Sequence, residues 1–261
     1  MRKISKKWFE LKNNIKNSDG SANVAELFIY GEITSYKWDD SDVTATEFKD
    51  ALDQLENIDR LDIFINSPGG SVFQGQAILS MLNRFKEKNN SKIRVVVDGI
   101  AASTASFIAM AGDTIEMPDN AMLMIHNAWV MTMGNAEDLR KTADDSDKVN
   151  QTIVNAYLGK AKVSEDKLKE LMDEESWLNA KDAADIFNIE IIEAKNIAAN
   201  IKSLTGNLKR FKNAPTFKFV DSKNETKDKR VVKIADLSNE KAAVEEALLR
   251  CQVINRLNKE W

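Results

Sequence analysis

Short apolar runs alternate with amphipathic stretches between Val24 and about Ala194, and this alternation constrains the fold more than any other feature. Five β-rich runs are predicted strands: LFIY near Tyr30, DIFIN ending at Asn66, IRVVV ending at Val97, TIEM ending at Met117 and AMLMI ending at Ile125. Apolar residues at helical spacing lie between them, in TATEFKDALDQLE after Val43 and from Val72 to Phe85. Near-continuous apolar strands separated by helices predict an α/β fold around a mostly parallel, buried sheet.

The second half of the chain is more polar and divides into further segments. Residues 135–172 predict a long projecting helix with a fresh start at Ser164, and Asn179 precedes another short helix. The sequence becomes strongly basic near 211–230, and helical spacing returns in Val244, Leu248, Cys251, Ile254 and Leu257. We therefore expect an N-terminal segment (1–22), one α/β domain large enough to be an enzyme (23–195), a charged linker or arm (196–237) and a C-terminal helix (238–261).

Composition excludes several classes of function. Lys and Arg number 37 against 41 Asp and Glu, so no overall basic field favours nucleic acid. No apolar run is long enough for a membrane span or a secretory signal, and the single cysteine, Cys251, fits a reducing, cytoplasmic location. One His and one Cys leave too few ligands for most metal sites, so neither metal nor cofactor is expected. His126 is the only imidazole available to a general-base mechanism.

Three clusters carry residues suited to catalysis. INSPGGS, Ile65 to Ser71, places two glycines where a strand turns into a helix, which suits either a tight turn or a close approach of backbone amides to a ligand. In DGIAASTASFIAMAG, Asp98 to Gly112, Ser103 stands at another strand-to-helix junction. Such a serine is either an ordinary N-cap or a nucleophile placed where a helix N-terminus favours negative charge.

His126 closes the apolar strand in the third cluster, MLMIHNAW. A histidine at a strand end is more often structural than catalytic. In a parallel sheet, however, all three clusters follow strands at the same edge, where α/β folds gather their ligands. The sequence has no GxSxG elbow, GxGxxG motif or P-loop, so neither an α/β-hydrolase nor nucleotide chemistry within this chain is indicated.

Taken together, INSPGG (Ile65 to Gly70), GIAAS (Gly99 to Ser103) and MIHN (Met124 to Asn127) resemble the Clp protease proteolytic subunit family. The resemblance covers about Val24 to Ala194 and implies a ClpP/crotonase-like superfold of stacked βαβ units with a projecting handle helix. In this chain it would be followed by the charged arm and helix. Carried over, it implies Ser103 as nucleophile, His126 as base, an oxyanion hole of Gly70 and Thr104, and substrate contacts at Gly69, Ile100 and Asn127.

The acid of the triad is less defined by the resemblance. The family places an Asp shortly before an aromatic residue that precedes its last short helix. In EESWLNAKDAADIF the corresponding residue is Glu175, two residues before Trp177. Asp173 and Glu174 are the alternatives.

Within the family, the Glu before Ser-Trp, the IHNAW sequence and the C-terminal extension resemble the Clp-like head maturation proteases of tailed bacteriophages. This implies a serine endopeptidase that cleaves scaffold or major capsid proteins in the host cytoplasm or prohead interior. It also implies a homo-oligomer, either a heptameric ring or a double ring. The alternatives are a cellular Clp peptidase working with an AAA+ unfoldase, a crotonase-like acyl-CoA enzyme, and a non-catalytic assembly scaffold.

Overall fold

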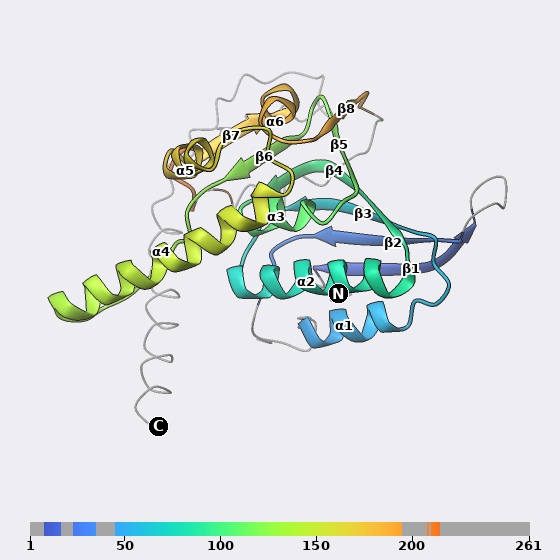
Figure 1. Ribbon diagram of the computed structural model, residues 1–261, viewed down its shortest axis with the longest axis horizontal. Coiled ribbons are helices and arrows are strands. Elements are labelled where there is room, and N and C mark those ends of the chain that lie inside the picture. The colour runs from blue at the N-terminus through green and yellow to red at the C-terminus, as the bar shows by residue number, and fades with distance from the viewer. Residues whose placement is uncertain (1–7, 17–22, 35–44, 195–207, 209, 215–261) are drawn as a thin grey trace, which may run out of the picture. The chain divides into compact units, whose positions relative to one another are not determined.

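Eight strands form one sheet in the described part of the chain, which comprises residues 8–16, 23–34, 45–194, 208 and 210–214 of a computed structural model (Figure 1). The order is β1-β2-β3-β4-β5-β8, and β6 pairs with both β4 and β7. The strands are β1 (Phe9–Lys16), β2 (Asn23–Tyr30), β3 (Arg60–Ser67), β4 (Lys92–Ala102), β5 (Thr114–Pro118), β6 (Met122–Ile125), β7 (Ser176–Asn179) and β8 (Glu190–Ile192). The predicted C-terminal helix, 238–261, lies outside the described residues.

Most of the strand pairs are parallel, as predicted. Only β1 with β2 and β6 with β7 run antiparallel among the described pairs. Both faces of β3 and β4 are largely covered, which explains why their sequences are apolar almost throughout rather than alternating. The mixed α/β architecture agrees with a ClpP-like fold.

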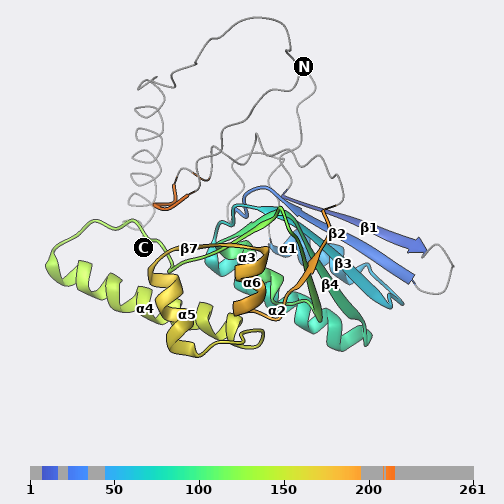
Figure 2. The same cartoon turned by 90° about the horizontal axis from the view of Figure 1, so that it is seen from above.

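Six helices accompany the sheet in the described residues: α1 (Ala45–Asp53), α2 (Val72–Asn89), α3 (Thr104–Ala109), α4 (Ala136–Leu158), α5 (Glu165–Asp173) and α6 (Ala180–Ile186). Helices α1 and α2 lie side by side along the sheet, and α4 extends away from it (Figures 1 and 2). Ser164 and Asn179 cap α5 and α6 through their side chains, at the starts that the sequence predicts.

The core lies between the sheet and its helices. Ile63, Ile65 and Val97 from the central strands are fully buried, and Ile78 and Leu82 of α2 belong to the same apolar cluster. Helix α3 is buried along its whole length, so the serine cluster leads into the buried core of the domain. A rigid core at this point supports the turns that follow β3 and β4.

Two features differ from the predicted elements. Strand β4 continues past the predicted end at Val97 as far as Ala102, because its second half pairs with β6 instead of β5. Strand β1 falls in the N-terminal segment, where no strand was predicted. There Trp8 and Phe9 pack on Phe48 of α1, with ring centroids 5.7 and 5.1 Å from that of Phe48, so tertiary contacts stabilise β1.

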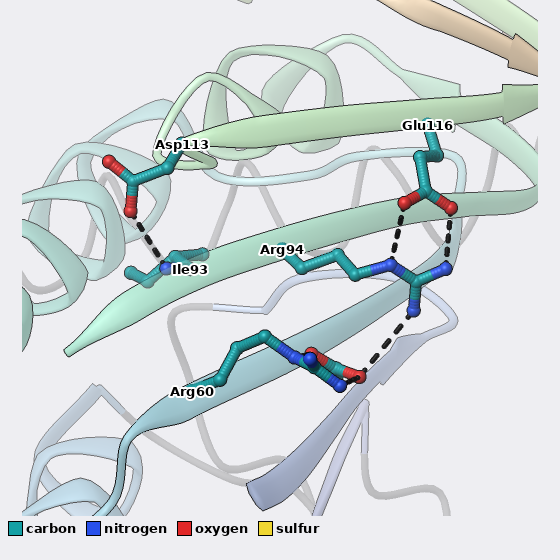
Figure 3. Close-up of polar contacts among 6 residues, drawn as sticks. Arg60, Ile93, Arg94, Asp113 and Glu116 are labelled. Atoms are coloured by element: carbon teal, nitrogen blue, oxygen red, sulfur yellow. Dashed lines mark hydrogen bonds and ion pairs between the residues drawn. The ribbon is translucent and has the colours of Figure 1, made fainter. Parts of the chain in front are cut away.

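A charged row crosses β3, β4 and β5 (Figure 3). The guanidinium of Arg94 forms a two-pronged contact with the carboxylate of Glu116 at 2.6 and 2.5 Å, and it lies 3.5 Å from Asp62. Arg60 donates to the same Asp62 at 2.6 Å, although Asp62 is only 6% exposed. These paired charges satisfy a carboxylate that would otherwise be costly to bury.

Candidate active site

The glycine turn follows β3 directly and is anchored by its own serine. Ser67 donates its hydroxyl proton to the carbonyl of Gly31 at 2.6 Å and accepts from the amide of Gly69 at 3.1 Å. Gly69 has φ +85°, a conformation that favours glycine. A Cβ at Gly69 would lie 2.8 Å from Ser103 Cβ and 2.9 Å from the amide nitrogen of Thr104, so the glycine and serine turns are in close contact.

Ser103 follows the last residue of β4 and precedes α3. Its φ of +55° is unusual for a serine, and its side chain makes no capping hydrogen bond to the helix. Instead Ser103 Oγ lies 2.7 Å from His126 Nε2. The amide of Ser103 donates to the carbonyl of Met124 at 2.9 Å. The observed contacts therefore differ from those of the ordinary N-cap considered above.

The oxyanion candidates Gly70 and Thr104 belong to adjoining turns. Thr104 Oγ1 donates to the carbonyl of Gly70 at 2.9 Å and joins the two turns. Because Thr104 is the first residue of α3, its amide has no acceptor within the helix. Gly70 and Thr104 are thus joined directly, and Thr104 is the residue that follows Ser103.

His126 follows β6, and its imidazole is partly buried. Burial lowers the pKa of His126 below its ordinary value, because the charged form loses solvation. The negative charge of Glu175 acts in the opposite direction, and the positive charge of Arg210 lowers the pKa further. The Phe211 ring packs edge-to-face on the imidazole, with 5.2 Å between ring centroids.

The three candidate acids have different surroundings. Glu175 has φ +52°, and its carboxylate accepts from the backbone amides of Lys212 at 3.1 Å and Asn213 at 2.6 Å. Asp173 accepts from the Asn127 side chain at 2.6 Å. The backbone carbonyl of Glu174 accepts from the Asn213 side chain at 2.8 Å, and both Asp173 and Glu174 are exposed. Of the three, Glu175 is the one whose charge acts on His126.

The remaining predicted site residues surround this centre. Gly69 is buried against the serine turn, and Asn127 follows His126 directly. Ile100 is buried in a small apolar cluster with Ala102, Met124, Leu208 and Phe211. Among the described residues, no group of three or more His, Cys, Asp or Glu is arranged to hold a metal ion. No described helix is both long and apolar enough to cross a membrane.

Sequence reasoning did not place residues 208 and 210–214 at the site. They lie in the segment predicted as a charged linker or arm, yet Leu208 and Phe211 are buried beside His126 and Trp177. The available signal was an apolar pair three residues apart within an otherwise basic stretch. Such a spacing places both side chains on one face of a helical turn.

A hydroxyl, an imidazole and a glycine turn at one edge of an α/β sheet have the arrangement of hydrolases that use an activated side-chain nucleophile. The sequence comparisons agree with this class. The family model described as Clp protease matches residues 22–194, and the chain belongs to the Clp protease family. The fold and membership together support a peptidase.

Three relatives illustrate the match, and each is named an ATP-dependent Clp protease proteolytic subunit. The protein from Bacteroides fragilis is 28% identical over 160 residues, which cover 59% of this chain and 75% of the relative. The protein from Streptococcus agalactiae is 29% identical over 149 residues, covering 56% and 74%. The protein from Pleurastrum terricola is 29% identical over 136 residues, which cover 51% of this chain and 67% of the relative.

Proposed function

We propose that this protein is a serine endopeptidase in which Ser103 is the nucleophile and His126 the general base. The observation that carries the proposal is the 2.7 Å contact between Ser103 Oγ and His126 Nε2. This distance lies within the range needed for direct proton transfer. Family membership supports peptide hydrolysis as the reaction.

His126 accepts and returns a proton in each of the two halves of the reaction. Ser103 Oγ attacks the scissile carbonyl while His126 Nε2 takes the hydroxyl proton, and the amides of Gly70 and Thr104 stabilise the oxyanion. His126 then returns the proton to the leaving amine, leaving an acyl group on Ser103. Water, activated by the same imidazole, hydrolyses that ester and restores the serine. Each oxyanion donor typically contributes about 2.7–4 kcal/mol.

We propose Glu175 as the acid that orients His126. Its electrostatic effect on the imidazole supports this choice over Asp173, which hydrogen-bonds to Asn127, and over Glu174. Gly69, Ile100 and Asn127 remain the proposed substrate contacts because they border the nucleophile or the base. The domain assignment proposed for 23–195 is consistent with the matched region of 22–194.

For the biological role, we propose a prohead protease that acts on scaffold or major capsid protein as a homo-oligomeric ring or double ring. The EESW sequence, the IHNAW sequence and the extension beyond residue 194 support this role. The alternative is a cellular subunit that works with an AAA+ unfoldase, and the names of the relatives favour it. In either role the protein would be a soluble enzyme of the cytoplasm.

The nucleophile is tested by labelling the intact chain with a fluorophosphonate probe and comparing it with Ser103→Ala and His126→Ala. Labelling that is present in the wild type and lost in Ser103→Ala supports Ser103 as the nucleophile. Equal labelling of the wild type and Ser103→Ala refutes it. The role is tested separately with purified scaffold and capsid proteins and with an unfoldase plus ATP. Cleavage without ATP favours the prohead protease, and ATP-dependent stimulation favours the cellular subunit.

A further inference from the structure

Residues 208 and 210–214, here termed the strap, contact the glycine turn, the proposed base and the proposed acid. Leu208 and Phe211 are only 4% and 8% exposed. They pack in a cluster with Ile100, Ala102 and Met124 on the ends of β4 and β6, and the Phe211 and Trp177 ring centroids are 5.9 Å apart. The strap therefore occupies a defined apolar site next to the base.

Polar contacts anchor the strap at both sides of this apolar site. Arg210 pairs with Glu32 at 2.5 Å and donates to the carbonyl of Pro68 in the glycine turn at 3.1 Å. On the other side, the amides of Lys212 and Asn213 each donate to a different oxygen of the Glu175 carboxylate. The four consecutive residues 210–213 thus connect the glycine turn to the proposed acid.

These contacts oppose the activation of His126. Phe211 contributes to burying the imidazole, and Arg210 brings a positive charge near it; both effects lower the pKa of His126. Two backbone amides also engage both oxygens of Glu175, and amide donors make a carboxylate a weaker acceptor for the imidazole N–H. Each effect makes the imidazole a weaker base for the Ser103 hydroxyl.

The strap lies outside the region that this chain shares with the Clp protease family model, which ends at residue 194. Its contacts are therefore additions to the shared catalytic domain. They involve an arginine, an aromatic ring and main-chain amides at successive positions, which explains how so short a segment reaches three separate turns.

We propose that the strap is an autoinhibitory element that holds Glu175 and covers one side of His126, and that its displacement activates the peptidase. This inference rests on the proposed Ser–His–Glu machinery. Displacement would remove both backbone amides from Glu175, leaving only the indole N–H of Trp177, 3.4 Å from Oε1, among the described donors. It would also expose the apolar site formed by Ile100, Met124 and Trp177. An orienting carboxylate contributes up to about 10⁴-fold in kcat in serine proteases, so a partial restraint leaves room for activation of about tenfold or more.

The test uses the full-length chain and two readouts, the pKa of His126 and the rate of peptide hydrolysis. Because His126 is the only histidine, its imidazole can be titrated on its own. Phe211→Ala removes the ring from the imidazole, and Arg210→Ala removes the charge and its anchors. Arg84→Ala on α2 is the matched control, since it deletes an exposed arginine elsewhere in the domain. The imidazole of each chain is titrated by NMR, and hydrolysis of an unstructured fluorogenic peptide is measured in parallel.

We expect Phe211→Ala to raise the pKa of His126 and to increase the hydrolysis rate by about tenfold or more, with a smaller increase for Arg210→Ala and none for Arg84→Ala. If the pKa of His126 is the same in all the variants, the autoinhibitory role of the strap is refuted, whatever the hydrolysis rates are. A raised pKa with a lower or unchanged rate shows that the strap supports catalysis, which also overturns autoinhibition. If the imidazole responds but no chain hydrolyses the peptide, the proposed function is refuted, and the regulatory role with it.

Discussion

Gly69→Ala probes the contact between the glycine turn and the serine turn. The added Cβ would meet the carbonyl oxygen of Ala102 at 2.5 Å, Ser103 Cβ at 2.8 Å and the amide nitrogen of Thr104 at 2.9 Å, all of which are closer than real Cβ contacts. The backbone at Gly69 also has φ +85°. A side chain in that conformation costs about 1–2 kcal/mol, and overpacking adds about 1–3 kcal/mol. We therefore expect a loss of about 2–5 kcal/mol in the free energy of unfolding.

Two other glycines separate these contributions. Gly31 has φ +103° and open space around its Cβ position, so Gly31→Ala should cost only the conformational part, about 1–2 kcal/mol. Gly159 has neither a positive φ nor a neighbour within 4 Å, so Gly159→Ala should be neutral or slightly stabilising. Urea unfolding monitored by circular dichroism measures all three variants.

Gly69→Ala should also reduce the rate of catalysis. Since the clash involves Ser103 and the Thr104 amide, the proposed nucleophile and the proposed oxyanion donor must both shift away from Gly69. A misplacement of about 1 Å costs about 10²-fold in rate. We expect this loss in kcat for Gly69→Ala under conditions where the variant is fully folded. The reasoning is refuted if Gly69→Ala is no less stable than Gly31→Ala and retains the wild-type kcat.

Three further predictions concern ionisable groups. His126 must be neutral to act as the proposed base, and burial lowers its pKa. The acid limb of the pH profile of kcat/KM should therefore lie below the ordinary histidine value of about 6.5. Glu175→Gln should move this limb to still lower pH, and an unmoved limb would exclude Glu175 as the partner of His126. Arg94→Met should lower the free energy of unfolding in urea by about 1–3 kcal/mol, because it removes the two-pronged contact with Glu116, and Arg94→Lys should have an intermediate effect. An Arg94→Met variant as stable as the wild type would contradict this. Burial raises the pKa of Asp98, so the folded state binds its proton more tightly than the unfolded state and stability falls as the pH rises through that pKa. Asp98→Asn should therefore raise Tm more at pH 8 than at pH 4, and equal shifts at the two pH values would reject this.

Much of the catalytic domain could be predicted from local patterns. The apolar runs ending near Tyr30, Asn66 and Ile125 mark buried strands because burial on both faces selects apolar side chains regardless of what lies opposite. Parallel pairing then places the turns after these strands at a common edge. On this argument Ser103 and His126 could be expected to approach each other. In the structure β4 and β6 indeed pair at the ends that precede these two residues.

The surroundings of Glu175 and the contacts of the strap could not be predicted from local patterns in the same way. Glu175 and Ser103 both adopt positive φ, a conformation for which neither residue type has a local preference, so the surrounding packing must impose it. The Phe211 contact with His126 spans 85 positions. An apolar pair three residues apart in a basic segment indicates a buried helical face, but it does not indicate which residues that face will cover.

By itself, the sequence determined the succession of strands and helices, the order of the glycine, serine and histidine turns, and the supply of a single imidazole. Only the tertiary structure decided that Ser103 Oγ and His126 Nε2 are 2.7 Å apart, that Glu175 is held by the amides of Lys212 and Asn213, and that β1 completes the sheet edge. The physical reason is that burial leaves a periodic pattern along the chain. Hydrogen-bond partners distant in sequence are set by sheet register and backbone geometry, which leave no such pattern.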